Sequence, residues 1–167
     1  MRDVEKWLNR IFKHEGEYWD DPVGGPTKYG ISQRSYPHLD IKNLSIQEAA
    51  DIYKKDFLEK IKYERYEDGV AFQLLDFAIH SGVSKSIKTL QKAIGVTEDG
   101  IAGEETFRRI EELIEPHLII LLLAYRLRYL TNLTNWNENS RGWARRIADN
   151  LLYAVEDTKL KETKSYG

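Results

Sequence analysis

Residues 3–16 of the chain are DVEKWLNRIFKHEG, and this stretch decides how the fold begins. Its apolar side chains recur every three or four residues, at Val4, Trp7, Leu8, Ile11 and Phe12. That spacing predicts an amphipathic helix with one apolar face. Asp3 is suited to cap the start of the helix, and Gly16 is suited to end it.

Glu15 lies at the end of this predicted helix, four residues after Ile11 and three after Phe12. Residues at those intervals share a helix face, so the sequence predicts a carboxyl that is partly withdrawn from water. Desolvation raises the pKa of a carboxyl, and the partial negative charge at a helix end raises it further. A carboxyl that keeps its proton near neutral pH is the general acid that a glycosidase needs. The alternative is a glutamate that turns outward into solvent.

The segment from Glu17 to Ile31 has no helical period and is rich in Gly, Pro, Asp and aromatic residues. It is therefore predicted as a loop or a short hairpin. Its residue types suit a carbohydrate site, because rings stack on sugars, carboxylates act as bases and glycines allow close approach to the backbone. The candidates are Tyr18, Trp19, Asp20, Asp21, Gly24, Gly25, Thr27, Tyr29 and Tyr36. The alternatives are core positions for the aromatics and turn capping for the aspartates.

The rest of the chain is predicted to be helical. The first three expected helices run from a Ser45–Glu48 capping box to about Phe57, over 70–79 up to Gly82, and from a Ser84 cap to Gly95. The next three run over 104–114, from Pro116 to about Leu133, and from a Ser140 cap to about Ala154. The Pro116 helix is apolar nearly all round in its first half, so it is placed at the centre of the fold. The predicted fold class is mainly α.

The composition excludes several classes of function. A net charge of −2 gives no general attraction to nucleic acid, and the longest apolar run, Leu118 to Tyr125, is too short to span a bilayer. The chain has no cysteine, and His14 has no second ligand at metal spacing, so no metal and no cofactor are expected. Residues 1–7 lack an apolar segment, which argues against a cleavable signal peptide.

The first half resembles a known family. The chain is similar to the signature of the glycoside hydrolase family 108 lysozymes at His14-Glu15-Gly16-Glu17-Tyr18, followed by residues 24–31 (GGPTKYGI). These are N-acetylmuramidases of phage endolysins and of bacterial relatives once called secretion activators. The likeness continues through Leu44-Ser45 with Glu48 and through Leu75-Asp76-Phe77 with Ser81-Gly82. It implies a lysozyme-like fold of two helical lobes, with a hairpin carrying the site and Glu15 as the catalytic acid.

A second resemblance covers most of the remaining chain. The chain is also similar to the helical peptidoglycan-binding module that accompanies this family. The similarity lies in residues 90–95 (LQKAIG), residues 99–103 (DGIAG), Thr106, Arg141-Gly142-Trp143 and Arg146. The two resemblances together imply a catalytic region over 1–83, a peptidoglycan-binding-like region over 84–157 and a polar tail over 158–167. Peptidoglycan strands are the implied partner of a monomer. With no signal peptide, the protein would be made in the bacterial cytoplasm and act at the cell wall after release or non-classical export.

The implied reaction is hydrolysis of the β-1,4 bond between N-acetylmuramic acid and N-acetylglucosamine, with Glu15 protonating the leaving oxygen. An inverting enzyme needs a second carboxylate to activate water; Asp21 is the first candidate and Asp20 the second, with Thr27 orienting the water. The family's usual second Asp-Pro before the glycine pair is missing here. The family tends to have Asn at the position of His80. Here His80 is predicted either to contact the substrate or to be a solvated side chain.

Two alternatives remain open at this point. A lytic transglycosylase would use Glu15 alone, with the sugar's own 6-hydroxyl in place of water. A non-catalytic cell-wall-binding protein would use only the second half of the chain.

Overall fold

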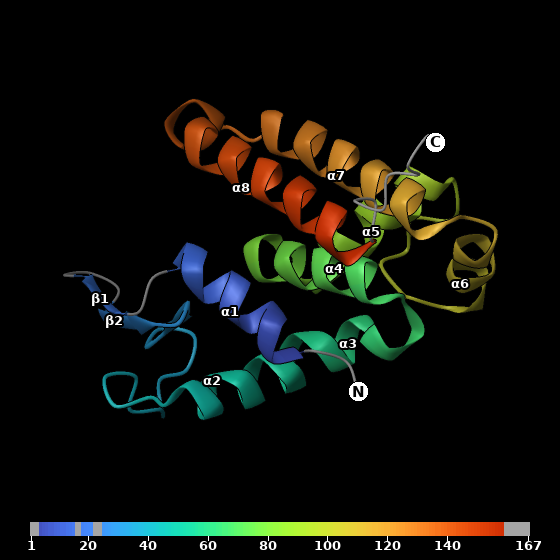
Figure 1. Cartoon of the computed structure of the whole chain (residues 1–167). Helices are drawn as coiled ribbons and strands as arrows, with labels where there is room; N and C mark the ends of the chain where they lie inside the picture. Colours follow the sequence, from blue (N-terminus) through green and yellow to red (C-terminus); the bar gives the residue numbers. More distant parts are fainter. Residues whose placement is uncertain (1–3, 16–17, 22–24, 159–167) are drawn as a thin grey trace, which may run out of the picture. The chain divides into compact units, whose positions relative to one another are not determined.

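The computed structural model describes residues 4–15, 18–21 and 25–158, and its contacts divide the chain into two compact units, residues 1–59 and 60–167 (Figure 1). Asp3, Gly16, Gly24 and the tail from residue 159 lie outside the described residues. Most described residues are helical, which confirms the predicted mainly α fold class.

The first unit consists of a helix, a small sheet and a second helix. Its elements are α1 (Val4–Glu15), β1 (Tyr18–Asp21), β2 (Gly25–Lys28), β3 (Ile31–Ser32), α2 (Ile46–Tyr53), the π-helical turn η1 (Lys54–Leu58) and the start of α3 (Glu59–Ile61). The strands are antiparallel in the order β1-β2-β3. The helix over 4–15, the hairpin and the helix running to about Phe57 are confirmed.

An aromatic cluster forms part of the core of the first unit. The apolar face of α1 is buried, and the Phe12 ring lies 4.9 Å from the Tyr29 ring and 5.9 Å from the Tyr53 ring, measured between centroids. The Tyr53 hydroxyl donates a hydrogen bond of 2.6 Å to the carbonyl of Tyr29. These contacts hold the turn between β2 and β3 against α1.

The predicted capping box at the start of α2 is present in full. The backbone N–H of Glu48 donates to the Ser45 hydroxyl at 3.2 Å, and the backbone N–H of Ser45 donates to a Glu48 carboxylate oxygen at 2.8 Å. Two backbone donors at the helix start are thereby satisfied.

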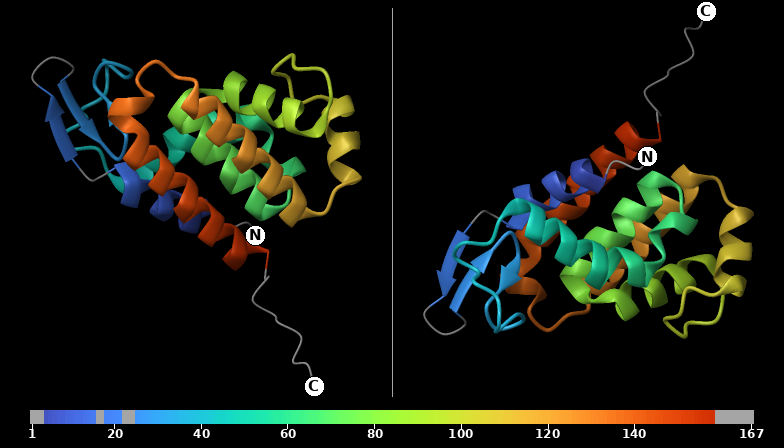
Figure 2. Two further views of the ribbon diagram at one scale, coloured as in Figure 1. Left: turned by 90° about the horizontal axis from the view of Figure 1, so that it is seen from above. Right: turned by 90° about the horizontal axis from the view of Figure 1, so that it is seen from below.

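The second unit is a set of helices around α4. Its elements are η2 (Tyr63–Arg65), α4 (Asp68–Ser81), α5 (Val83–Ile94), α6 (Glu104–Glu111), α7 (Glu115–Thr131) and α8 (Trp136–Asp157). Every residue of α4 from Gly69 to Ala78 is buried, and α4 packs against α5, α7 and α8. Figure 2 shows α7 running beside α8 from two sides.

The prediction that the Pro116 helix is central is therefore wrong in part. The central helix is α4, whereas α7 buries one face and leaves Ile120 56% exposed. The compact units also do not follow the regions 1–83 and 84–157, because α4 packs with the later helices. Those regions stay a prediction drawn from the resemblance.

Two predicted helix caps are wrong. Ser84 lies inside α5, because Gly82, with φ of 89°, is the one residue between α4 and α5 and leaves no room for a serine cap. Ser140 lies inside α8, which starts at Trp136 after Asn135. Two helices also end earlier than predicted, α6 at Glu111 and α7 at Thr131. The end of α5 at Gly95, in the left-handed conformation with φ of 76°, is confirmed.

A buried carboxylate links three helices of the second unit. Asp76 of α4 is fully buried and accepts from Arg126 of α7 at 2.7 Å, from Arg146 of α8 at 2.8 Å and from Asn150 of α8 at 2.8 Å. Burial alone would raise the pKa of Asp76, but the charges and hydrogen bonds of the two arginines outweigh it and hold the pKa below its ordinary value.

The amide of Gln91 closes the loop between α5 and α6. Its Nε2 donates to Asp99 Oδ1 at 2.7 Å, to the Ile101 carbonyl at 3.0 Å and to the Thr106 hydroxyl at 3.1 Å, while its Oε1 accepts from the Gly100 N–H at 2.9 Å. The Leu-Gln and Asp-Gly motifs of the second resemblance therefore meet in one structural contact.

Replacing Asp76 with Asn should destabilise the protein by about 3–5 kcal/mol, because Arg126 would keep a buried charge with no anionic partner. Urea unfolding at pH 7 measures this. The control is Glu104→Gln, which breaks the exposed Arg65–Glu104 pair and should leave the unfolding midpoint close to that of the wild type. Equal midpoints for the two variants would contradict the prediction.

Candidate active site

The strand register separates the two candidate aspartates. Trp19 is paired with Thr27 and Asp21 with Gly25, while Tyr18 is paired with Lys28 and Asp20 with Pro26. Because successive residues of a strand alternate between faces, positions 19, 21, 25 and 27 share one face of the ribbon and positions 18, 20, 26 and 28 share the other. Asp21 and Thr27 thus occupy the same face, and Asp20 does not.

The face that carries Asp20 also carries Tyr18. The side chains of both residues are exposed, and the Tyr18 hydroxyl lies 3.5 Å from Asp20 Oδ2, at the outer limit of a hydrogen bond. Asp20 therefore has an aromatic neighbour on its own strand. The side chains of Trp19 and Asp21 lie outside the described structure.

Gly25, Thr27 and Tyr29 follow one another along β2 and the turn after it. Gly25 has φ of +75°, a conformation that favours glycine, and Thr27 is half-buried. Tyr29 has the positive φ of 52°, and its ring packs on Phe12. The structure thus gives Tyr29 a packing role within the first unit, and its contact with substrate stays a prediction.

Glu15 is the last residue of α1, one turn after the buried Phe12. Two residues separate it from β1, so the chain keeps the Cα atoms of Glu15 and Tyr18 within about 11 Å of each other. The helix end and the sheet are therefore neighbours through the covalent chain. The Glu15 side chain lies outside the described structure, so its desolvation stays a prediction.

His80 lies in the last turn of α4, in the second unit. Its Nδ1 is 3.3 Å from Arg126 Nη2, and its ring lies edge-on to Trp143 with centroids 5.5 Å apart. A guanidinium only donates, so Nδ1 accepts and the ring proton sits on Nε2. Burial, followed by the charges of Arg126 and Arg146, lowers the pKa of His80 to about 4. His80 is thus half-buried rather than freely solvated, and its contact with substrate stays a prediction.

Sequence reasoning missed the residues that surround His80. The ring of the half-buried Trp143 lies 6.0 Å from the ring of the half-buried Trp136, measured between centroids. Asp76 holds Arg126 and Arg146 next to the histidine. Asp76, Trp143 and Arg146 belong to the motifs of the two resemblances. Those motifs were the available signal, but they did not reveal that the residues form one cluster.

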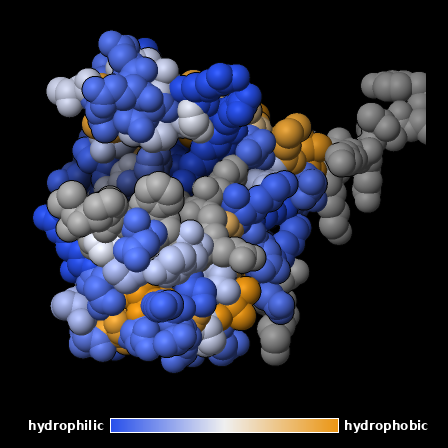
Figure 3. All heavy atoms as spheres, turned by 90° about the vertical axis from the view of Figure 1, so that its left-hand side faces the viewer, coloured by the Kyte–Doolittle hydropathy of each residue, from blue (hydrophilic) through white to orange (hydrophobic). Residues whose placement is uncertain are grey.

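Two observations on the described residues concern metal binding and membrane spanning. No group of three or more His, Asp or Glu side chains suited to a metal gathers among the residues that the structure describes. Over the same residues, no helix is both long and apolar enough to cross a membrane. On the face drawn in Figure 3, hydrophilic side chains predominate and apolar ones gather in small patches.

Comparisons with known proteins agree on one family. The model of the family described as Glycosyl hydrolase 108 matches residues 8–82. A solved structure that resembles this chain is that of SagA from Brucella abortus, with 30% sequence identity and a TM-score of 0.84, covering 93% of this chain and 95% of that one. No curated protein matches the chain. The structural similarity confirms the predicted lysozyme-like fold.

The folded state should resist protonation of His80. The pKa of His80 is lower in the folded protein than in the unfolded chain, so the unfolded chain binds more protons between about pH 6.5 and pH 4. This contribution to stability is complete above pH 6.5 and is lost as the pH falls through that window. Urea unfolding of the wild type and His80→Gln at pH 7 and pH 4.5 should therefore show a smaller loss on acidification in the variant. Equal losses would contradict the assignment.

Proposed function

Because the chain belongs to the glycosyl hydrolase 108 family, we propose that it is a muramidase, which hydrolyses the β-1,4 bond between N-acetylmuramic acid and N-acetylglucosamine in peptidoglycan. Family membership supports a peptidoglycan hydrolase in general. The finer assignment rests on one observation: α1 ends at Glu15, and only two residues separate this end from a two-stranded ribbon on which positions 21 and 27 share one face.

Glu15 is the proposed general acid. It follows Ile11 by four residues and Phe12 by three, and both of these side chains are buried, so position 15 continues the buried face of α1. The carbonyls at the end of the helix carry partial negative charge, which disfavours a second anion there. Both effects favour the protonated carboxyl, and that form delivers a proton to the glycosidic oxygen.

Asp21 is the proposed base. In the inverting mechanism a carboxylate at roughly 6.5–9.5 Å from the acid activates the attacking water. The register favours Asp21 over Asp20, because Thr27 shares the face of Asp21 and its hydroxyl can orient the same water. Trp19, the register partner of Thr27, and Gly25 would border the sugar on this face, while Tyr18 would be available on the other face.

Glu15→Gln should lower the rate of peptidoglycan hydrolysis by roughly 10²–10⁴-fold, because the amide cannot donate the proton that the leaving sugar needs. Loss of turbidity of a cell-wall suspension measures the rate. The matched control is Glu5→Gln, the same change on the exposed first turn of the same helix, which should keep wild-type activity. Lysis by Glu15→Gln at the control rate would remove Glu15 from the mechanism.

Asp21→Asn should lower hydrolysis by roughly 10²–10⁴-fold, and Asp20→Asn should leave it nearly unchanged. Mass spectrometry of the digest should show reducing-end muramic acid. Products with 1,6-anhydro ends, together with activity in both variants, would instead identify a lytic transglycosylase that uses Glu15 alone. A wild type that binds walls without cleaving them would identify a non-catalytic wall-binding protein.

A further inference from the structure

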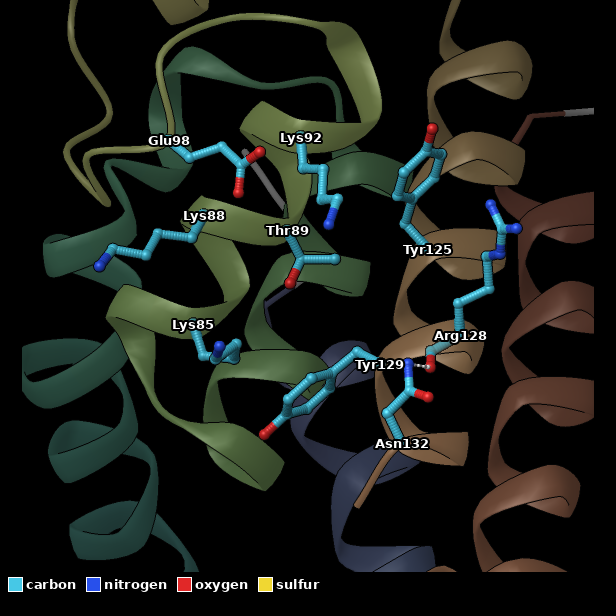
Figure 4. A pocket seen from close by; sticks show the side chains of 9 residues that line it. All are labelled: Lys85, Lys88, Thr89, Lys92, Glu98, Tyr125, Arg128, Tyr129 and Asn132. Carbon is cyan, nitrogen blue, oxygen red and sulfur yellow. Dashed lines mark hydrogen bonds between the residues drawn. The ribbon is translucent and has the colours of Figure 1, made fainter.

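A groove of about 520 Å³ lies between α5 and α7 in the second unit (Figure 4). Lys85, Lys88 and Lys92 lie on one face of α5, because they are three and four residues apart. From α7, Tyr125, Arg128 and Tyr129 follow the same spacing and line the other side. In Figure 4 the Lys92 side chain extends into the space between the two helices.

The groove concentrates positive charge in a chain whose net charge is −2. Its three lysines and Arg128 are exposed, and none of them lies within ion-pair distance of a carboxylate among the described residues, although the charge of Lys88 helps to lower the pKa of Asp99. Lys88 and Lys92 are four residues apart on one helix face, an arrangement of like charges that destabilises a helix. An anionic ligand would offset this repulsion.

The aromatic side of the groove is held in place from below. The Tyr129 ring packs against Phe77 of α4, with centroids 5.9 Å apart, and the Lys85 ammonium lies 4.9 Å from the centroid of the same tyrosine ring. Thr89, between the lysines, is 7% exposed and closes the groove on the α5 side. The groove therefore combines packed aromatic walls with exposed cationic side chains.

We propose that this groove binds the acidic stem peptide of peptidoglycan, an inference that rests on the proposed substrate. A stem peptide carries several free carboxylates, aliphatic side chains and, where it contains a diamino acid, one ammonium group. The lysines and Arg128 match the carboxylates, and the faces of Tyr125 and Tyr129 match the aliphatic parts. Glu98, the carboxylate that lines the groove, matches the ammonium group.

The lining favours a peptide over a phosphate polymer. A polyphosphate carries no cation, so Glu98 would repel it at the rim of the groove. A ligand with separated carboxylates and one amine satisfies every charged group that lines the groove.

The test uses the full chain and a synthetic stem tetrapeptide that contains γ-linked glutamate and a diamino acid. In ¹⁵N-resolved NMR the peptide should shift the amide signals of Lys85–Lys92 and of Tyr125–Tyr129. The double variant Lys88→Gln/Lys92→Gln should weaken binding about tenfold through the loss of two charge contacts. The matched control, Lys55→Gln/Lys60→Gln, makes the same charge change at exposed positions outside the groove and should bind as the wild type does.

Two further probes test the assignment of the charges. A peptide with amidated carboxylates should bind the wild type at least as weakly as the free peptide binds the double variant. Glu98→Gln should weaken binding of the free peptide but not of a peptide acetylated on its side-chain amine. Absent shifts in the groove, or equal affinities of the two double variants, would overturn the proposal. Tighter binding of poly(glycerol phosphate), unaffected by Glu98→Gln, would overturn it in favour of a phosphate polymer.

Digestion of two substrates separates this inference from the proposed function. On glycan strands stripped of their peptides, Lys88→Gln/Lys92→Gln should match the wild type, and on intact walls it should be slower. If the double variant digested both substrates at the wild-type rate, the proposed role of the groove would be contradicted and the proposed muramidase activity would stand. A wild type that cleaves neither substrate but binds the peptide would overturn the muramidase and keep the groove.

Discussion

The ion pairs of Asp76 are the interaction on which the second unit depends. Taking a carboxylate and two guanidinium groups out of water costs several kcal/mol per ion, and only close, multiple hydrogen bonds offset that cost. Asp76 receives such bonds from Arg126, Arg146 and Asn150, so α4, α7 and α8 meet in one arrangement. The same arginines lie near His80 and help to lower its pKa, so the protonation of this histidine depends on the arginines that Asp76 holds in place.

The first unit solves a different problem, because it has to hold a small three-stranded sheet in a fixed relation to one helix. It does so with aromatic packing and one hydrogen bond. Phe12 contacts Tyr29 and Tyr53, and the Tyr53 hydroxyl binds the backbone of Tyr29. These contacts fix the turn after β2, and the register of β1 with β2 then sets which residues share a face. The proposed acid and base both depend on this positioning.

The two units are proposed to bind different parts of the substrate. The first unit would supply the acid, the base and the water-orienting hydroxyl, all within residues 15–27. The second would hold the peptides that branch from the glycan, through the cationic groove between α5 and α7. A polymer that carries both sugars and acidic peptides offers each unit a chemically distinct part to recognise.

Local patterns in the chain were sufficient to predict α1, the hairpin, the Ser45–Glu48 capping box and the end of α5 at Gly95, because each depends on residues within a few positions of one another. The family signature likewise made Glu15 and the segment after it the candidate site, and their catalytic roles stay a prediction. Sequence spacing did not reveal that Asp76 binds partners 50, 70 and 74 residues away, that α4 rather than α7 is central, or that position 21 rather than position 20 shares a face with Thr27. Those features arise from packing between distant segments and from strand register, which no short stretch of sequence contains.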